Sequence, residues 1–125
     1  MGQIKYNKKE EAFEISYKLW EREVTVRFYV EEESEIMDNF SEIAQKLDKL
    51  NRNKKKIAEI IADEGYYSGA SEILADCLQI TSAYIDIDED GVVICFNVDS
   101  TDGYLTPLSM ELGYDNGIEV TGKLN

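Results

Sequence analysis

The chain has 125 residues, 43% of them hydrophobic, with one Pro and eight Gly, which is the size and apolar content of one ordinary domain spanning 1–125. Histidine is absent, so Ser–His and Cys–His catalysis, His-ligated zinc and imidazole acid–base chemistry are excluded. The formal net charge of −13 falls entirely in residues 57–125, where 14 acidic residues stand against Lys123, which disfavours nucleic acid as a partner because phosphates are repelled.

The N-terminal segment predicts a β-hairpin. "MGQIKYNKKEEAFEI" holds no apolar run of the signal-peptide kind, and no later stretch is long enough for a membrane span, so we expect a cytoplasmic protein without a membrane partner. Residues 13–19 and 24–30 each alternate apolar and polar side chains, and "WERE" between them is typical of a hairpin connection.

Helical periodicity replaces the alternation after residue 30. The spacing predicts one helix over 34–50, with Ser34 as its N-cap and Phe40 in its apolar stripe. "NRNKKK" then separates this helix from a second one, which Gly65 is expected to end in a left-handed conformation. "ASEILADCLQI" predicts a third short helix that buries Ile73.

From Ala83 onward the period returns to two, in "YIDID", "VVICFNV", "LSMELGY" and "IEVTGKL". Asp90-Gly91 predicts a hairpin turn with positive φ at the glycine, and Asn116-Gly117 predicts a type I′ turn with positive φ at both positions. The fold class expected is therefore α+β. It comprises a mostly antiparallel sheet of about six strands (an N-terminal hairpin plus a C-terminal four-strand meander), with three helices on one face, in the order ββαααββββ.

The segment "DIDEDGVVICFN" begins like a calcium-binding loop. Asp86, Asp88, Asp90 and Gly91 meet the first requirements of an EF-hand loop, but Asn97 stands where a bidentate glutamate is needed. The flanking residues alternate like strands rather than helices, so we predict a hairpin and expect no metal and no cofactor. A weakly held cation at this acidic tip is the alternative.

The same alternation predicts an acidic open face on the sheet. If Ile85 and Ile87 point toward the helices, the neighbouring carboxylates must point away from them. The carboxylates expected on this face or in the adjoining loops are Asp86, Asp88, Glu89, Asp90, Asp99, Asp102, Glu111 and Glu119. Such a surface suits a basic protein partner, whose encounter it would accelerate, or it serves solubility alone; the sequence leaves both readings open.

Three tyrosines are candidate anchors for a partner. Tyr66 and Tyr67 occupy the glycine-flanked corner "GYYSG", and Tyr104 follows "TDG" in an expected loop. Tyrosine is enriched at binding hot spots because it buries a large area with few rotatable bonds. The alternative is that these rings pack over helix ends with their hydroxyls in water.

Catalysis is not expected from this sequence. The carboxylates are dispersed rather than paired in a cleft, and "STDGYLTP" offers hydroxyls without a base to activate them. Cys77 and Cys95 lie in apolar runs and are expected to be reduced core thiols rather than a disulfide.

The order of hairpin, helices and meander resembles a family of small bacterial α+β proteins of unknown function. The matching positions are Trp20, Val24 and Val26 in the first hairpin, followed by "VICFNVDSTDGYLTPLSMELGYDNGIEVTG". The resemblance covers most of residues 18–123. Many relatives carry a Gly-His pair where this chain has Thr106-Pro107, and this departure weighs further against a catalytic role.

The resemblance implies an immunity protein of a polymorphic or contact-dependent toxin system. Such a protein would bind and neutralise a cognate toxin domain in the cytoplasm, and an acidic surface would suit the basic cleft of a nuclease-like toxin. The expected partner-binding residues are Asp86, Asp88, Glu89, Asp90, Asp99, Asp102, Glu111, Tyr66, Tyr67 and Tyr104. The alternative is a non-catalytic interaction or assembly module, as a homodimer that meets its twin through Val93, Cys95 or the N-terminal strand edge.

Overall fold

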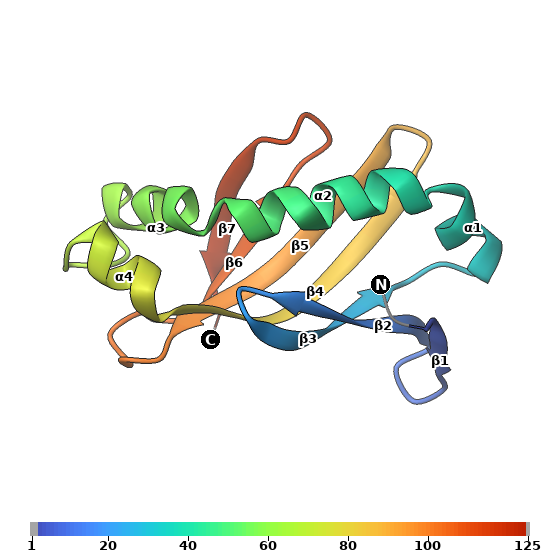
Figure 1. Cartoon of the computed structure of the whole chain (residues 1–125), viewed down its shortest axis with the longest axis horizontal. Helices are drawn as coiled ribbons and strands as arrows, with labels where there is room; N and C mark the ends of the chain where they lie inside the picture. Colours follow the sequence, from blue (N-terminus) through green and yellow to red (C-terminus); the bar gives the residue numbers. More distant parts are fainter. Residues whose placement is uncertain (1–2, 125) are drawn as a thin grey trace.

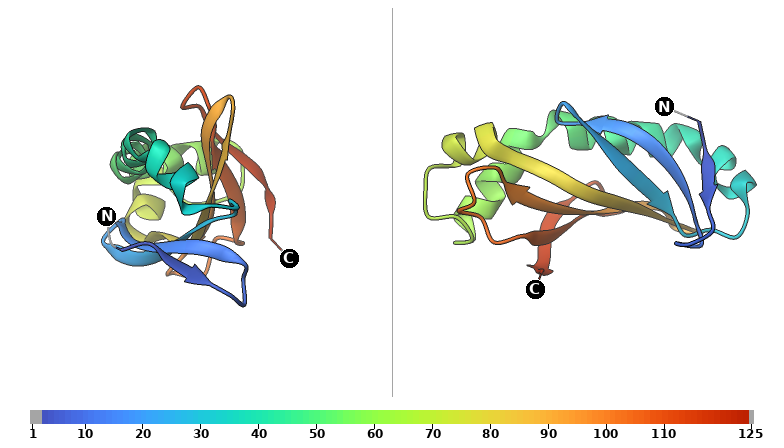
Figure 2. Two further views of the ribbon diagram at one scale, coloured as in Figure 1. Left: turned by 90° about the vertical axis from the view of Figure 1, so that its right-hand side faces the viewer. Right: turned by 90° about the horizontal axis from the view of Figure 1, so that it is seen from below.

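The computed structural model describes residues 3–124, which form seven strands and four helices (Figure 1). In chain order the elements are β1 (Lys5–Asn7), β2 (Ala12–Leu19), β3 (Arg22–Phe28), α1 (Glu33–Asp38), α2 (Phe40–Arg52), α3 (Lys54–Asp63), α4 (Ser71–Cys77), β4 (Leu78–Asp88), β5 (Gly91–Ser100), β6 (Leu108–Leu112) and β7 (Ile118–Lys123). The helices lie together on one face of the sheet, and no helix within residues 3–124 covers the other face (Figure 2). The expected α+β class is confirmed.

The strands are neighbours in the same order as in the chain, from β1 to β7. Strands β3 and β4 pair in parallel, with Val26 beside Ala83, because the chain returns through the helices between them. The other neighbouring strands of the described sheet are antiparallel. The acidic C-terminal strands β4–β7 therefore occupy one side of the sheet, and the N-terminal hairpin extends the other side.

Two counts expected from the sequence are wrong. Strand β1 adds a seventh strand to the described sheet; its three residues pair with β2, and a segment this short carries too little alternation to be recognised. The helix expected over 34–50 is divided at Asn39 into α1 and α2, which makes four helices in residues 3–124. The N-cap of α1 is Glu32 in a capping box with Glu35, rather than Ser34.

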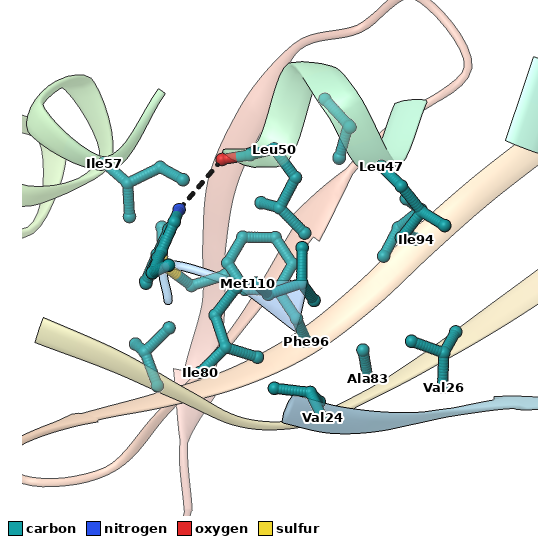
Figure 3. Packing of buried hydrophobic residues seen from close by; sticks show 14 of the residues in the cluster. Val24, Val26, Leu47, Leu50, Ile57, Ile80, Ala83, Ile94, Phe96 and Met110 are labelled. Atoms are coloured by element: carbon teal, nitrogen blue, oxygen red, sulfur yellow. Dashed lines mark hydrogen bonds between the residues drawn. The ribbon is translucent and has the colours of Figure 1, made fainter. Parts of the chain in front are cut away.

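The core lies between the helices and the inward-pointing rows of the sheet. Ile94, Phe96 and Met110 are at most 1% exposed, and they face Leu47 and Leu50 of α2 (Figure 3). The period-two alternation of β4–β6 placed these side chains correctly, but Val93, expected on the outward face and as a dimer contact, is only 6% exposed.

Two helical residues expected in the core are exposed instead. Phe40 begins α2 after the break at Asn39, which alters the helical phase of its side chain, and Ile73 points outward from α4. Cys77 and Cys95 are free thiols of intermediate exposure. Cys77 packs against the core cluster as expected, whereas Cys95 lies outside it.

The first hairpin turns at Trp20 and Glu21, whose φ angles of 51° and 68° lie in the left-handed region. Side chains without a glycine's freedom adopt this conformation at a cost, and α2 compensates with three hydrogen bonds. The Trp20 indole N–H donates to the Leu50 carbonyl oxygen (3.0 Å), and the Trp20 backbone N–H donates to Asn51 Oδ1 (2.8 Å). The Asn51 amide in turn donates to the Lys18 carbonyl oxygen (2.9 Å).

The two C-terminal hairpins have different turns. Asp88 pairs with Gly91 across a two-residue connection, and the φ of Gly91 is 127°, which confirms the hairpin predicted in place of a calcium loop. The type I′ prediction for Asn116-Gly117 is wrong, because Asn116 alone has a positive φ (66°). The connection is longer than two residues, with the Gly113 N–H donating to the Gly117 carbonyl oxygen at 2.9 Å.

Candidate protein-binding surface

Strands β4–β7 present a row of carboxylates on the face of the sheet that lies opposite the helices. Glu111 is the register partner of Cys95 on one side and of Glu119 on the other, and Asp86 is the register partner of Val93. We call the following residues the acidic face: Asp86, Asp88, Asp99, Glu111 and Glu119. Asp86, Asp88 and Glu119 are exposed, and Asp99 and Glu111 are partly exposed. They alternate along their strands with side chains that are buried or pack against the core, as the alternation predicted.

The negative charge of the acidic face is not balanced by ion pairs. Within residues 3–124, the ion pairs are Arg27–Glu14 and Arg52–Asp48, and neither includes a residue of the acidic face. Glu111 and Glu119 stand directly opposite each other on neighbouring strands, an arrangement that destabilises a sheet. The acidic face therefore carries an uncompensated negative potential.

The tip of the β4–β5 hairpin is tied to the β6–β7 connection. The Tyr114 hydroxyl donates to Asp88, and the backbone N–H of Asp90 donates to Asp88 Oδ1 at 2.8 Å. These two hydrogen bonds hold the pKa of Asp88 below its usual value, and the Asp88 carboxylate raises the pKa of Tyr114 to about 12. Glu89 and Asp90 remain exposed at the tip.

Lys46 of α2 fixes the β6–β7 connection from the helix side. Its side chain is 4% exposed, and Nζ donates to the Gly113 carbonyl oxygen (2.6 Å) and to Asn116 Oδ1 (3.0 Å). Burial lowers the pKa of Lys46. In Figure 1 the tips of both C-terminal hairpins project beyond α2, so this ammonium group supports a segment that extends from the body of the sheet.

The ten residues expected to bind a partner do not form one site. Four of them lie beyond the end of β5 that is away from the hairpin tip: Asp102, Tyr66, Tyr67 and Tyr104. Strand β5 has ten residues and is therefore on the order of 30 Å long. The hairpin tip with Asp88 lies at the other end of that strand. These four residues are therefore separated from the hairpin tip by the length of β5, and the ten residues stay a prediction as a binding set.

Asp102 has an internal structural role. Its oxygens accept hydrogen bonds from the Ser100 hydroxyl, the Tyr104 backbone N–H (3.0 Å) and the Tyr67 hydroxyl (2.9 Å). The Ser100 bond is the largest of the contributions that lower the pKa of Asp102 to about 2. This carboxylate joins the β5–β6 loop to the corner before α4.

The three tyrosines differ in their surroundings. Tyr67 is 7% exposed and belongs to the core cluster, so it is a packed corner residue and not a free anchor. Tyr66 is partly buried, and Lys123 Nζ lies 5.9 Å from its ring centroid. Tyr104 is 81% exposed, but it stands at the end of the sheet away from most of the acidic face.

Three further exposed tyrosines, not predicted as anchors from the sequence, lie beside the acidic face. Tyr84 is two residues before Asp86 in β4, Tyr29 directly follows β3, and Tyr114 contacts Asp88. The alternation of "VTVRFYV" and "YIDID" already placed Tyr29 and Tyr84 on the outward face. What the sequence could not show is that the parallel pairing of β3 with β4 brings these two rings together.

The described residues offer no assembled site for a metal ion. Within residues 3–124, no group of three or more Cys, Asp or Glu side chains could hold one. An open hollow of about 480 Å³ along the β6–β7 hairpin is lined by Glu111, Tyr114 and Glu119, among others. A larger hollow of about 840 Å³ lies beside Trp20 and Lys54, on the side of the first hairpin. The carboxylates of the acidic face are arranged along an open surface rather than in a cleft.

Comparisons with protein-family models, with curated proteins and with solved structures found no match to this chain. The resemblance to immunity proteins therefore stays a prediction from the sequence. Among the helices of residues 3–124, none has the length and apolar character needed to cross a membrane.

Proposed function

We propose that this protein is a cytoplasmic immunity protein, a non-catalytic inhibitor that binds a cognate toxin domain with a basic, nuclease-like cleft. The observation that carries the proposal is the acidic face, whose five carboxylates, three exposed and two partly exposed, take part in no ion pair within residues 3–124. A nuclease cleft is basic because it must hold phosphates, so an acidic protein surface can occupy the same cleft.

Electrostatics would serve such an inhibitor chiefly through the rate of encounter. Opposite potentials on two proteins raise the association rate by about 10- to 1000-fold at low salt, and the gain falls steeply with ionic strength. An immunity protein must capture its toxin before damage occurs, so a fast encounter is useful to it. The hydrogen bonds around Asp88 and Lys46 further favour binding because the hairpins need little ordering when the complex forms.

The test is co-purification with the product of the adjacent reading frame, followed by measurement of Kd and association rate at two salt concentrations. The acidic-face variant combines Asp86→Lys, Glu111→Lys and Glu119→Lys. The control variant combines Glu59→Lys, Asp63→Lys and Glu72→Lys, which are exposed on α3 and α4 and change the net charge by the same amount.

We expect the acidic-face variant to weaken binding about 100-fold or more, because like charges facing each other across an interface cost several kcal/mol. The control should stay within about five-fold of the unmodified protein, since it alters only the long-range field. Tight binding that survives reversal of the acidic face rules out this surface. A stable homodimer that binds no neighbouring product would favour the alternative of an assembly module.

A further inference from the structure

Two tyrosine rings stand side by side at the border of the acidic face. Tyr29 and Tyr84 are 53% and 41% exposed, and their ring centroids are 6.1 Å apart at an interplanar angle of 72°. Large aromatic side chains left this exposed on a sheet face are typical of a binding hot spot.

The Tyr84 ring has neighbours on both adjacent strands. The Cys95 thiol beside the Tyr84 hydroxyl is the main cause that raises the pKa of Tyr84 to about 12. Cys95 is the register partner of Tyr84 on β5. The edge-to-face contact with Tyr29 positions the Tyr84 ring before any partner arrives, which lowers the entropy lost on binding.

The charges around the pair are unequal. Asp86 follows Tyr84 on the same face of β4, and Asp86 and Glu111 both act electrostatically on Tyr84. On the other side, Arg27 is the register partner of Tyr84, but its guanidinium is bound to Glu14 at 2.8 Å. A cation that approaches Tyr84 from the β5 side thus meets unpaired carboxylates.

We propose that the Tyr29–Tyr84 pair is an arginine-binding anchor, where a guanidinium of a basic protein partner stacks on an aromatic ring while Asp86 accepts its N–H groups. Arginine suits this geometry better than lysine because its planar group can stack on a ring and bind a carboxylate with two parallel hydrogen bonds. The inference rests on the proposed function in that the partner is a basic protein, and it adds the chemistry of the contact.

The test uses two end-blocked peptides of equal charge, (Arg-Gly-Ser)4 and (Lys-Gly-Ser)4, titrated into the full chain and followed by NMR. We expect the arginine peptide to bind about two- to five-fold more tightly, the gain of a cation–π contact at an exposed site. The largest shifts should fall on the rings of Tyr29 and Tyr84 and on the Asp86 amide.

Three variants make the test specific. Tyr84→Leu should abolish the preference for arginine, whereas Tyr84→Phe keeps the ring and should retain it. Tyr104→Leu is the matched control, since Tyr104 is the more exposed tyrosine but stands at the far end of β5. The control should bind both peptides as the unmodified protein does.

Equal affinity for the two peptides, or a preference that survives Tyr84→Leu, overturns the proposal. So does a change in sedimentation on Tyr84→Leu in the absence of peptide, which would assign the pair to contact with a second copy of the chain. A failed complex with the neighbouring gene product, together with an intact arginine preference, would reject the immunity role and keep the anchor. A tight complex with the neighbouring gene product that Tyr84→Leu does not weaken would keep the immunity role and reject the anchor.

Discussion

Replacing Lys46 with methionine tests the link between the helical layer and the C-terminal hairpins. Methionine keeps the buried apolar stem of the side chain but removes the donor to the Gly113 carbonyl oxygen and to Asn116 Oδ1. Each hydrogen bond from a charged group contributes about 1.5–3 kcal/mol, and relief from burying the ammonium offsets part of the loss. We expect the free energy of unfolding to fall by about 2 kcal/mol.

The measurement is urea denaturation with Lys49→Met as the control on the same helix. No hydrogen bond or ion pair involves the Lys49 side chain within residues 3–124, so its replacement should change stability by less than about 0.5 kcal/mol. For a chain of this size, a loss of about 2 kcal/mol corresponds to a Tm lower by about 8 °C. If the two variants unfold at the same urea concentration, the assigned role of Lys46 is wrong.

Two other substitutions probe the first turn and the far end of β5. Asn51→Ala should lower the free energy of unfolding by about 2 kcal/mol, because the Trp20 N–H and the Lys18 carbonyl oxygen each lose a partner. Asn51→Asp keeps the acceptor for the Trp20 N–H, so its free energy of unfolding should fall by about half as much in the same urea titration. For Asp102, the folded pKa of about 2 lies below the ordinary value of 3.8, so its contribution to stability is present above pH 3.8 and is lost as the pH falls through about 2. Thermal melts of Asp102→Asn should therefore show a lower Tm than the unmodified protein at pH 7 and the same Tm below pH 2, and a difference that persists in acid would contradict this.

The C-terminal sheet was predictable because one physical rule governs it. Side chains of a strand alternate between faces, and Ile85, Ile94 and Met110 followed that rule into the core. The same rule predicts the outward positions of Asp86 and Glu111, so the acidic face is predictable from the sequence alone.

The remaining features depend on contacts that the local sequence does not record. The first hairpin turns at Trp20 and Glu21 without a glycine, and the compensating hydrogen bonds come from a helix about thirty residues away in the chain. The break at Asn39 lies inside an apolar pattern that continues across it, so periodicity alone predicts one helix. The position of a tyrosine in a loop predicts an exposed anchor, and this rule is wrong for Tyr67, whose side chain is buried.

Lys46→Met also separates two explanations of how the acidic face would bind a basic partner. The substitution removes a positive charge from a protein of net charge −13, so long-range attraction alone would make binding of a basic toxin slightly faster and tighter. Loss of the bonds that hold Gly113 and Asn116 has the opposite effect, because loosened hairpins must be ordered again when the complex forms. We expect the second effect to prevail as a faster dissociation at an unchanged or slightly increased association rate, measured by surface plasmon resonance against the adjacent gene product. A tighter complex would show that charge alone governs recognition and that the rigid support from α2 serves stability only.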